Sequence, residues 1–170
     1  MPYVLAAILT LAPSLPQATA RDYARIIERE SQRYHVDPLL VVTIIHVESS
    51  WNTRARSVTH DWGLMQVHVS ETSNPRLLGR EKVLFDPEVG IRFGVRTLAM
   101  WWKYHRRACG KRPKHLTWGH YQWGHRVRTH EWSYKVRDVY LALQEKTRRP
   151  RHGPNRFPRE SQLAFLEGHR

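Results

Sequence analysis

The chain has 170 residues, of which 41% are hydrophobic and 11% aromatic, so we expect one domain with a substantial core. Lys and Arg number 28 against 15 Asp and Glu, and the net charge of +13 predicts an acidic partner such as nucleic acid, an anionic membrane surface or an acidic polysaccharide. The single cysteine excludes an internal disulfide and a zinc cluster built on cysteines, and no HExxH or HxxxH pair indicates a metal site on histidines.

The first twenty residues, MPYVLAAILTLAPSLPQATA, differ in character from the rest of the chain. An apolar run is followed by two prolines and by Ala18-Thr19-Ala20, which fits the A-x-A pattern of a signal-peptide cleavage site. The run is shorter than the roughly 20 residues that a membrane-spanning helix needs. We therefore predict that residues 1–20 are a secretory signal and that the protein is exported to the periplasm or cell envelope. No Lys or Arg precedes the run, so the alternative is an apolar segment that packs on the domain or anchors it.

Two helices are predicted at the start of the body of the chain. Residues 21–34 place apolar side chains on one face and charged side chains on the others, which is typical of an amphipathic helix. Asp37 and Pro38 combine an N-cap with a proline at the first helical position. The helix that they begin ends near Ser49 and is apolar on nearly every side, which predicts a place in the core.

The second half of the chain predicts further helices. Asp86-Pro87 starts a helix that runs to about residue 105, a short helix or turn covers 115–124, and a final helix covers 131–146. The stretch before them, 52–72, has weak periodicity and is expected to be irregular, with a short β element near residues 61–69. We thus expect a mainly α domain over residues 21–146.

The residues after Lys146 form a basic, proline-rich segment with little apolar material. This composition is typical of a flexible tail, which we predict over residues 147–170. Such a tail could hold the protein to an anionic cell envelope, or to a secretion or phage assembly. A location in a phage particle is therefore the alternative to export.

Glu48 closes the aliphatic segment VDPLLVVTIIHVE. A carboxylate at the end of such a helix is costly to bury unless it is paired, protonated or catalytic. From spacing alone, three interpretations remain open. Glu48 is a solvated helix-end residue, a structural partner of Arg54 or Arg56, or a general acid.

Four blocks of the sequence resemble the soluble lytic transglycosylase (SLT) family of the lysozyme-like superfamily, and the short loops resemble its small single-domain members. Over residues 34–143 they are, in order, ESSWN (48–52) with Ala55, Ser57 and GLMQ (63–66); LFDPEVGIRFGVRTL (84–98); HYQWG (120–124); and Glu131 with VRDV (136–139). The resemblance implies a lysozyme-like, mainly α fold of two lobes with a cleft. It also implies cleavage of the β-1,4 bond between N-acetylmuramic acid and N-acetylglucosamine in peptidoglycan, without a metal or organic cofactor.

By this resemblance Glu48 is the catalytic residue. It protonates the glycosidic oxygen, then accepts the proton of the muramic acid C6 hydroxyl, which attacks C1 and leaves a 1,6-anhydro product. An apolar wall raises the pKa of such an acid so that it holds a proton near neutral pH. The positions that match the family's substrate-binding residues are Ser57, Met65, Gln66, His68, Tyr121 and Glu131.

The resemblance implies particular roles for these residues, and each has a structural alternative. Ser57 would contact the substrate or hold Glu48, or else form a turn. Gln66 would bind a sugar in the cleft, or else be a strand residue. Tyr121 would orient Glu48 or the sugar, or else be a core aromatic residue. Glu131 would bind substrate, or favour the start of its helix through the helix dipole. His68 stands where the family has a second methionine, which affects the expected sugar selectivity.

Asp61 opens a second enzymatic interpretation. The block DWGLMQ also resembles the DYGxxQ block of animal lysozymes, in which the aspartate is a second catalytic carboxylate. Hydrolysis with retention requires two carboxyl groups about 5–5.5 Å apart. If Asp61 instead caps a turn before Gly63, the anhydro product is expected, and we favour that interpretation.

A non-catalytic binder is the alternative of another class. Basic residues between Trp101 and Arg137 are interleaved with aromatic ones, as in proteins that bind single-stranded nucleic acid. Aromatic side chains also stack on sugar rings, and the predicted signal argues against nucleic acid. We therefore expect a monomer whose partner is the glycan strands of peptidoglycan.

Overall fold

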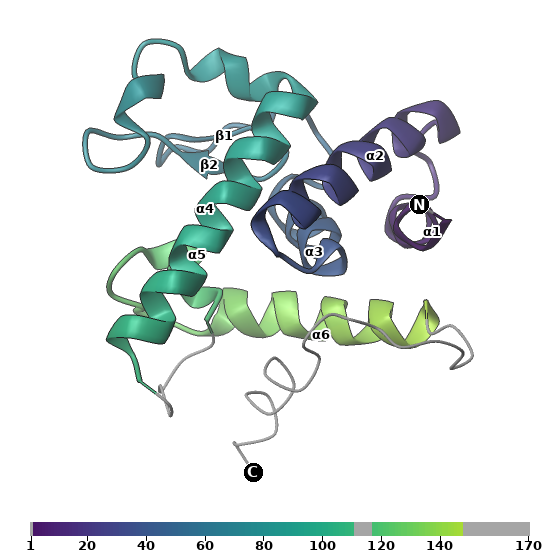
Figure 1. The fold of residues 1–170 in the computed structure, drawn as a ribbon. Coiled ribbons are helices and arrows are strands. Elements are labelled where there is room, and N and C mark those ends of the chain that lie inside the picture. The colour runs from purple at the N-terminus through teal and green to yellow at the C-terminus, as the bar shows by residue number, and fades with distance from the viewer. Residues whose placement is uncertain (1, 111–116, 148–170) are drawn as a thin grey trace.

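The computed structural model describes residues 2–110 and 117–147, so nearly all of the predicted tail lies outside the described residues. Figure 1 shows helices arranged around α3, with a small antiparallel sheet to one side, which confirms the mainly α prediction. The elements are α1 (Pro2–Leu11), α2 (Gln17–Tyr34), α3 (Pro38–Ser49), β1 (Asp61–Trp62), β2 (Val67–His68), the 3-10 helices η1 (Pro75–Leu77) and η2 (Glu81–Phe85), α4 (Pro87–Ala108), α5 (Gly119–Trp123) and α6 (Glu131–Lys146).

The predicted helix starts at α3 and α4 are confirmed, together with their chemistry. The Asp37 carboxylate accepts a hydrogen bond from the Leu39 N–H at 2.9 Å, and the Asp86 carboxylate accepts one from the Val89 N–H at 3.0 Å. Each cap satisfies a backbone donor that the first turn of a helix leaves unpaired. Helix α2, by contrast, begins at Gln17, four residues earlier than predicted.

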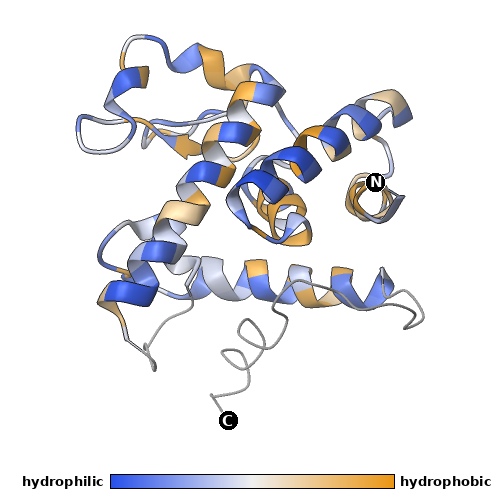
Figure 2. Ribbon diagram, in the orientation of Figure 1, coloured by the Kyte–Doolittle hydropathy of each residue, from blue (hydrophilic) through white to orange (hydrophobic). Residues whose placement is uncertain are grey.

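Helix α3 forms the centre of the core. Seven consecutive residues from Leu39 to Ile45 are buried, because α1, α2 and α6 all pack against this helix. In Figure 2 the visible part of α3 is largely orange, whereas α2, α4 and α6 alternate between orange and blue. The Tyr140 hydroxyl of α6 donates a hydrogen bond to the Asp37 carboxylate, so one side chain both caps α3 and joins it to α6.

Helices α2 and α4 are joined by ion pairs around the buried carboxylate of Glu30. Glu30 is 1% exposed, and its carboxylate lies 2.9 Å from the Arg29 guanidinium and 3.9 Å from that of Arg92 on α4. Arg92 also pairs with Glu88 at 2.9 Å. A buried carboxylate must be paired to remain ionised, so these arginines hold the two helices at a fixed register.

The segment between α3 and α4 contains the predicted short β element. Asp61 pairs with His68 and Trp62 with Val67 across the antiparallel ladder. Gly63 follows β1 with φ +74°, and a Cβ built on it would lie 2.2 Å from the Leu84 carbonyl oxygen. Only glycine fits this turn, which brings the β element close to η2.

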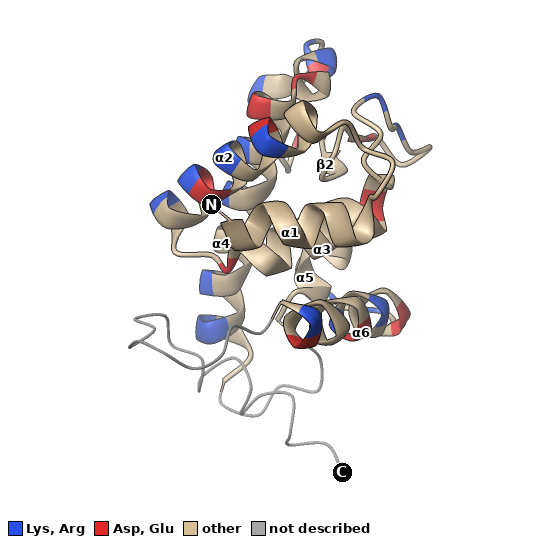
Figure 3. Ribbon diagram, turned by 90° about the vertical axis from the view of Figure 1, so that its right-hand side faces the viewer, with Lys and Arg blue, Asp and Glu red and all other residues tan. Residues whose placement is uncertain are grey.

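Helix α1 occupies the segment predicted as a signal. Val4, Ala7 and Ile8 are fully buried, and the helix packs against α2 and α3, as Figure 3 shows from the side on which α1 faces the viewer. The predicted cleavage position after Ala20 lies inside α2, and Ala20 is buried. Among the described residues, no helix is both long and apolar enough to cross a bilayer. The packed arrangement is thus the alternative expected from the sequence, and cleavage after Ala20 stays a prediction.

The packing of α1 predicts a loss of stability when its buried side chain is shortened. In protein that retains residues 1–20, Ile8→Ala should lower the free energy of unfolding by about 2–4 kcal/mol, because it removes fully buried methyl groups and leaves a cavity. Urea denaturation measures this change. Val58→Ala is the control, since Val58 is 98% exposed, and it should change stability by less than about 0.5 kcal/mol. Equal stabilities for the Ile8→Ala variant and the wild type would show that α1 does not pack on the core.

Candidate functional site

Glu48 lies in the last turn of α3, and its carboxyl group is only partly exposed. Burial, and after it the negative charge of Asp61, raise the pKa of this carboxyl from its ordinary value of 4.5, whereas Trp132 and Lys135 on α6 lower it, and the net pKa is about 8. The negative end of the α3 dipole lies at the same place and also disfavours the ionised form. Glu48 therefore holds a proton at neutral pH, as a general acid must.

Asp61 lies on β1, where three side chains fix its carboxylate. Its Oδ2 accepts hydrogen bonds from the Ser57 and Thr59 hydroxyls, each at 2.6 Å, and its Oδ1 lies 2.8 Å from His68 Nδ1. The Asp61 N–H also donates to the Ser57 hydroxyl at 3.0 Å. Two predicted site residues, Ser57 and His68, thus contact Asp61 here.

Tyr121 on α5 joins the third sequence block to the second. Its hydroxyl donates a hydrogen bond to the Met65 carbonyl oxygen at 2.8 Å, and its ring stacks on Trp132 with centroids 6.1 Å apart and an angle of 11° between the planes. Burial raises the pKa of the phenol well above its ordinary value, and the charges of Glu48 and Asp61 add to the increase. Tyr121 is therefore a neutral donor next to both carboxyl groups.

Met65 and Gln66 brace the loop after β1. The Met65 side chain is fully buried next to Gly94 of α4, where a Cβ on the glycine would lie 2.4 Å from the Met65 sulfur. Met65 therefore contacts Tyr121 through its backbone carbonyl group. Gln66 has a positive φ of 45°, and its amide nitrogen donates to the Ala55 and Gly63 carbonyls at 3.1 and 2.9 Å. Gln66 therefore lies in the turn between β1 and β2 and not in a strand, and its amide oxygen is left for a substrate.

The start of α6 supplies two residues that the sequence analysis did not single out. Glu131 is the first residue of the helix and is exposed, and Trp132 and Lys135 follow it, three residues apart on one face. The indole N–H of Trp132 is buried and acts on the Glu48 carboxyl as a donor, although the contact falls outside ideal hydrogen-bond geometry. Both side chains lower the pKa of Glu48, so both favour its carboxylate form. No motif in the sequence singles out either residue.

Two hollows on the described surface lie away from Glu48. One is lined by the loop at Thr53 and Arg54 together with Lys82, Phe85 and Asp86, and the other lies between α2 and the start of α4. Neither contains the buried acid or the stacked aromatic pair. The functional assignment accordingly depends on the side chains around Glu48, which are the Asp61 carboxyl group, the Tyr121 phenol and the Trp132 indole.

Comparison with known proteins identifies related sequences. The family model described as "Transglycosylase SLT domain" matches residues 25–115. Relatives include the membrane-bound lytic murein transglycosylases C of Edwardsiella ictaluri (strain 93-146), 33% identical over 99 residues (54% of this chain, 28% of the relative), and of Mannheimia succiniciproducens, 37% identical over 83 residues (45% and 23%). Membrane-bound lytic murein transglycosylase E of Buchnera aphidicola is 33% identical over 84 residues (45% and 38%).

In each case the chain spans less than two fifths of the relative's length. No solved structure matches. The family match includes Glu48, Asp61 and Gln66 but ends before Tyr121 and Glu131. For Tyr121, the contact with Met65 provides separate support.

The raised pKa of Glu48 predicts how stability depends on pH. The folded state binds this proton more tightly than the unfolded chain, so the contribution is complete below pH 4.5 and is lost as the pH rises to about 8. Between pH 5 and 8.5, the free energy of unfolding should therefore fall less for Glu48→Gln, which cannot ionise, than for the wild type. The difference between the two decreases should be roughly 1–3 kcal/mol. Urea denaturation at both pH values tests this, with Glu145→Gln on the exposed end of α6 as control. Parallel pH profiles for wild type and Glu48→Gln would contradict the assignment.

The Tyr121 hydroxyl predicts a second stability change. Tyr121→Phe keeps the stacked ring but leaves the Met65 carbonyl without its donor, which should cost about 1 kcal/mol in the free energy of unfolding. Thermal or urea unfolding measures it. Tyr134→Phe, at a position that is 43% exposed on α6, is the matched control and should change stability by less than about 0.5 kcal/mol. Equal effects of the two substitutions would show that the α5 contact does not form.

Proposed function

Because the chain belongs to the transglycosylase SLT domain family, we propose that it is a peptidoglycan lytic transglycosylase in which Glu48 is the general acid and base. The observation that carries this proposal is the carboxyl group of Glu48, whose pKa of about 8 lets it hold a proton at neutral pH. A general acid works best when its pKa lies near the operating pH. A protein that only binds glycan would not need an acid tuned in this way.

The reaction returns Glu48 to its starting state. Protonated Glu48 donates its proton to the oxygen that bridges C1 of N-acetylmuramic acid and C4 of N-acetylglucosamine, and the C1–O bond breaks. The Glu48 carboxylate then accepts the proton of the muramic acid C6 hydroxyl as its oxygen bonds to C1. The Trp132 N–H and the Lys135 cation support the carboxylate between the two steps, since both lower the pKa of Glu48.

Asp61 acts in this proposal through its charge. The bond-breaking step places positive charge on C1 and the ring oxygen, and a nearby anion stabilises that charge. Both Asp61 oxygens already interact with Ser57, Thr59 or His68, and these contacts make the carboxylate a weaker nucleophile. This arrangement favours the anhydro product over lysozyme-type hydrolysis with Asp61 as second carboxylate.

The proposed partner is the glycan strand of peptidoglycan in the cell envelope. The names of the relatives describe membrane-bound enzymes of murein. A net charge of +13 fits a substrate that carries carboxylates on its lactyl and peptide groups. Export by the segment 1–20 belongs to the same proposal, and intact-mass measurement of the protein from the envelope fraction would show whether cleavage occurs after Ala20.

The test is mass spectrometry of soluble muropeptides released from purified sacculi. Wild type should release 1,6-anhydro-muropeptides, and Glu48→Gln should reduce the rate by about 10²–10⁴-fold, which is the usual contribution of general acid–base catalysis. Glu145→Gln controls for loss of a surface charge and should act like the wild type.

The Asp61→Asn variant separates the two mechanisms. In the proposed one the products remain anhydro sugars and the rate falls, because the stabilising charge is lost. If wild type releases reducing-end products that Asp61→Asn does not, the enzyme is a two-carboxylate hydrolase. If wild type releases nothing, the protein is a binder and the proposal fails.

A further inference from the structure

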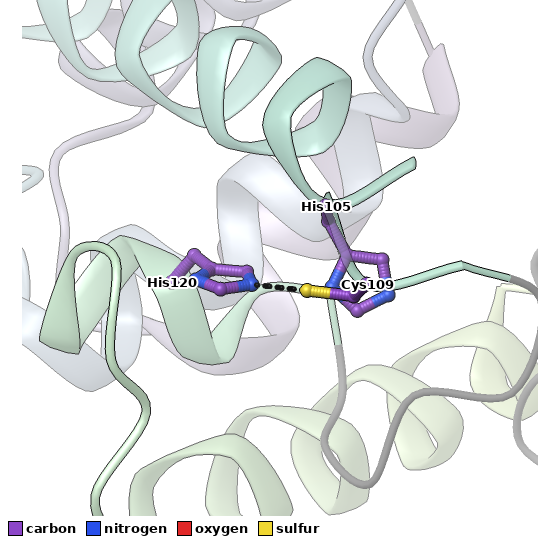
Figure 4. Close-up of side chains that lie close together, drawn as sticks. All are labelled: His105, Cys109 and His120. Carbon is purple, nitrogen blue, oxygen red and sulfur yellow. Dashed lines mark hydrogen bonds between the residues drawn. The ribbon is translucent and has the colours of Figure 1, made fainter. Parts of the chain in front are cut away.

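Three side chains outside the Glu48 site meet where α4 ends and α5 begins. His105 and Cys109 are four residues apart and lie on one face of the last turn of α4, and His120 comes from α5 (Figure 4). One ring nitrogen of each histidine and the cysteine Sγ all lie within 4.8 Å of one another. Both imidazoles are buried, with His105 3% and His120 0% exposed.

The distances suit a tetrahedral metal ion. Cys109 Sγ lies 3.4 Å from His120 Nε2. With bonds of about 2.3 Å to sulfur and about 2.0–2.1 Å to nitrogen, a tetrahedral zinc ion holds such a pair about 3.5 Å apart. The sulfur and this nitrogen therefore already stand at ligand spacing. A ring nitrogen of His105 lies within 4.8 Å of both and would move closer on binding the ion.

The hydrogen bond on the far side of His120 presents the correct nitrogen. His120 Nδ1 lies 2.6 Å from the Gly124 carbonyl oxygen, which can only accept, so Nδ1 carries the proton and Nε2 directs a lone pair toward Cys109. Histidines that bind metals usually make this contact to a carbonyl or carboxylate. The ring is also fixed by stacking on Trp101, with centroids 5.8 Å apart, and by the edge of Tyr104 at 5.1 Å.

The local charge favours a cation over an isolated thiolate. Cys109 is the C-cap of α4, where the negative end of the helix dipole attracts positive charge. As a free thiol, Cys109 carries one proton on its sulfur. A bound ion would displace that proton to solvent and leave a thiolate ligand. The alternative is a simple hydrogen bond from the thiol to Nε2, which uses the same tautomer.

We propose that His105, Cys109 and His120 bind one divalent transition-metal ion of the zinc type, with a fourth position open to water or another ligand. Nitrogen and sulfur ligands select such ions over magnesium or calcium. The ion joins the C-terminal end of α4 to α5. Because Tyr121 directly follows His120, the same ion fixes the helix that places the phenol at the Glu48 site. This site does not depend on the proposed function.

The experiment uses Co²⁺ alone, titrated into full-length, tag-free protein that has been treated with a chelator. Cys109 is the only cysteine, so a sulfur-to-cobalt charge-transfer band can arise only from this residue. We expect one equivalent of Co²⁺ to produce this band together with the strong visible bands of a four-coordinate ion, and Zn²⁺ to remove both. Cys109→Ser and His120→Gln should each weaken binding by at least about 100-fold.

Controls separate this site from adventitious binding and from misfolding. His60→Asn removes an exposed histidine at φ +64°, a conformation that asparagine tolerates, and should leave the titration unchanged. Circular dichroism checks the fold of each variant. In wild type, one equivalent of Zn²⁺ should also slow the reaction of the single thiol with a disulfide reagent by 10-fold or more. A wild-type titration without the charge-transfer band, or with an unchanged thiol reaction rate, would overturn the proposal.

Discussion

The candidate site depends on a carboxyl group held where an apolar helix ends. Burial, the charge of Asp61 and the negative end of the α3 dipole all raise the pKa of Glu48. The Trp132 indole and the Lys135 cation lower this pKa, but by less. The balance keeps the carboxyl protonated near neutral pH and still lets it become an anion during a reaction. The same group can then give up and recover a proton, so no second protein acid is required.

The rest of the fold keeps these groups together. Helices α3 and α6 run in opposite directions, since Tyr140 near the end of α6 bonds to Asp37 at the start of α3, whereas Trp132 at the start of α6 lies near Glu48 at the end of α3. The Tyr121 phenol then links α5 to the Met65 carbonyl after β1. Each of these contacts joins segments that are far apart in the sequence, so the site forms only in the complete domain.

Much of the fold could be predicted because its signals are local. Asp37 and Asp86 are each followed directly by a proline, and helices α3 and α4 begin at these pairs. Glu48 stands out because it ends an aliphatic run, and the family blocks supplied its role. Helix α2 begins before the expected cleavage position, and it packs against α1. Composition alone does not show this packing.

Other parts could not be predicted, because they arise from contacts between distant segments. Ser57 and His68 match family positions, but only the fold shows that both interact with Asp61. The ligand spacing of His105 and Cys109 is readable in the sequence, yet without His120 from another helix it indicates no metal site. Trp132 and Lys135 belong to no motif and act through proximity to Glu48.

The double role of Asp37 has a mechanical consequence. One Asp37 carboxylate oxygen caps α3 and the other accepts the Tyr140 phenol of α6, so a shift of α6 along α3 would break the Tyr140 bond. Asp61 belongs to the separate segment that carries β1 and β2, so a shift of that segment would move Asp61 relative to Glu48. As Asp61 recedes, its repulsion of the Glu48 anion weakens and the acid becomes stronger. The position of one short hairpin thus adjusts the proton affinity of the group beside it.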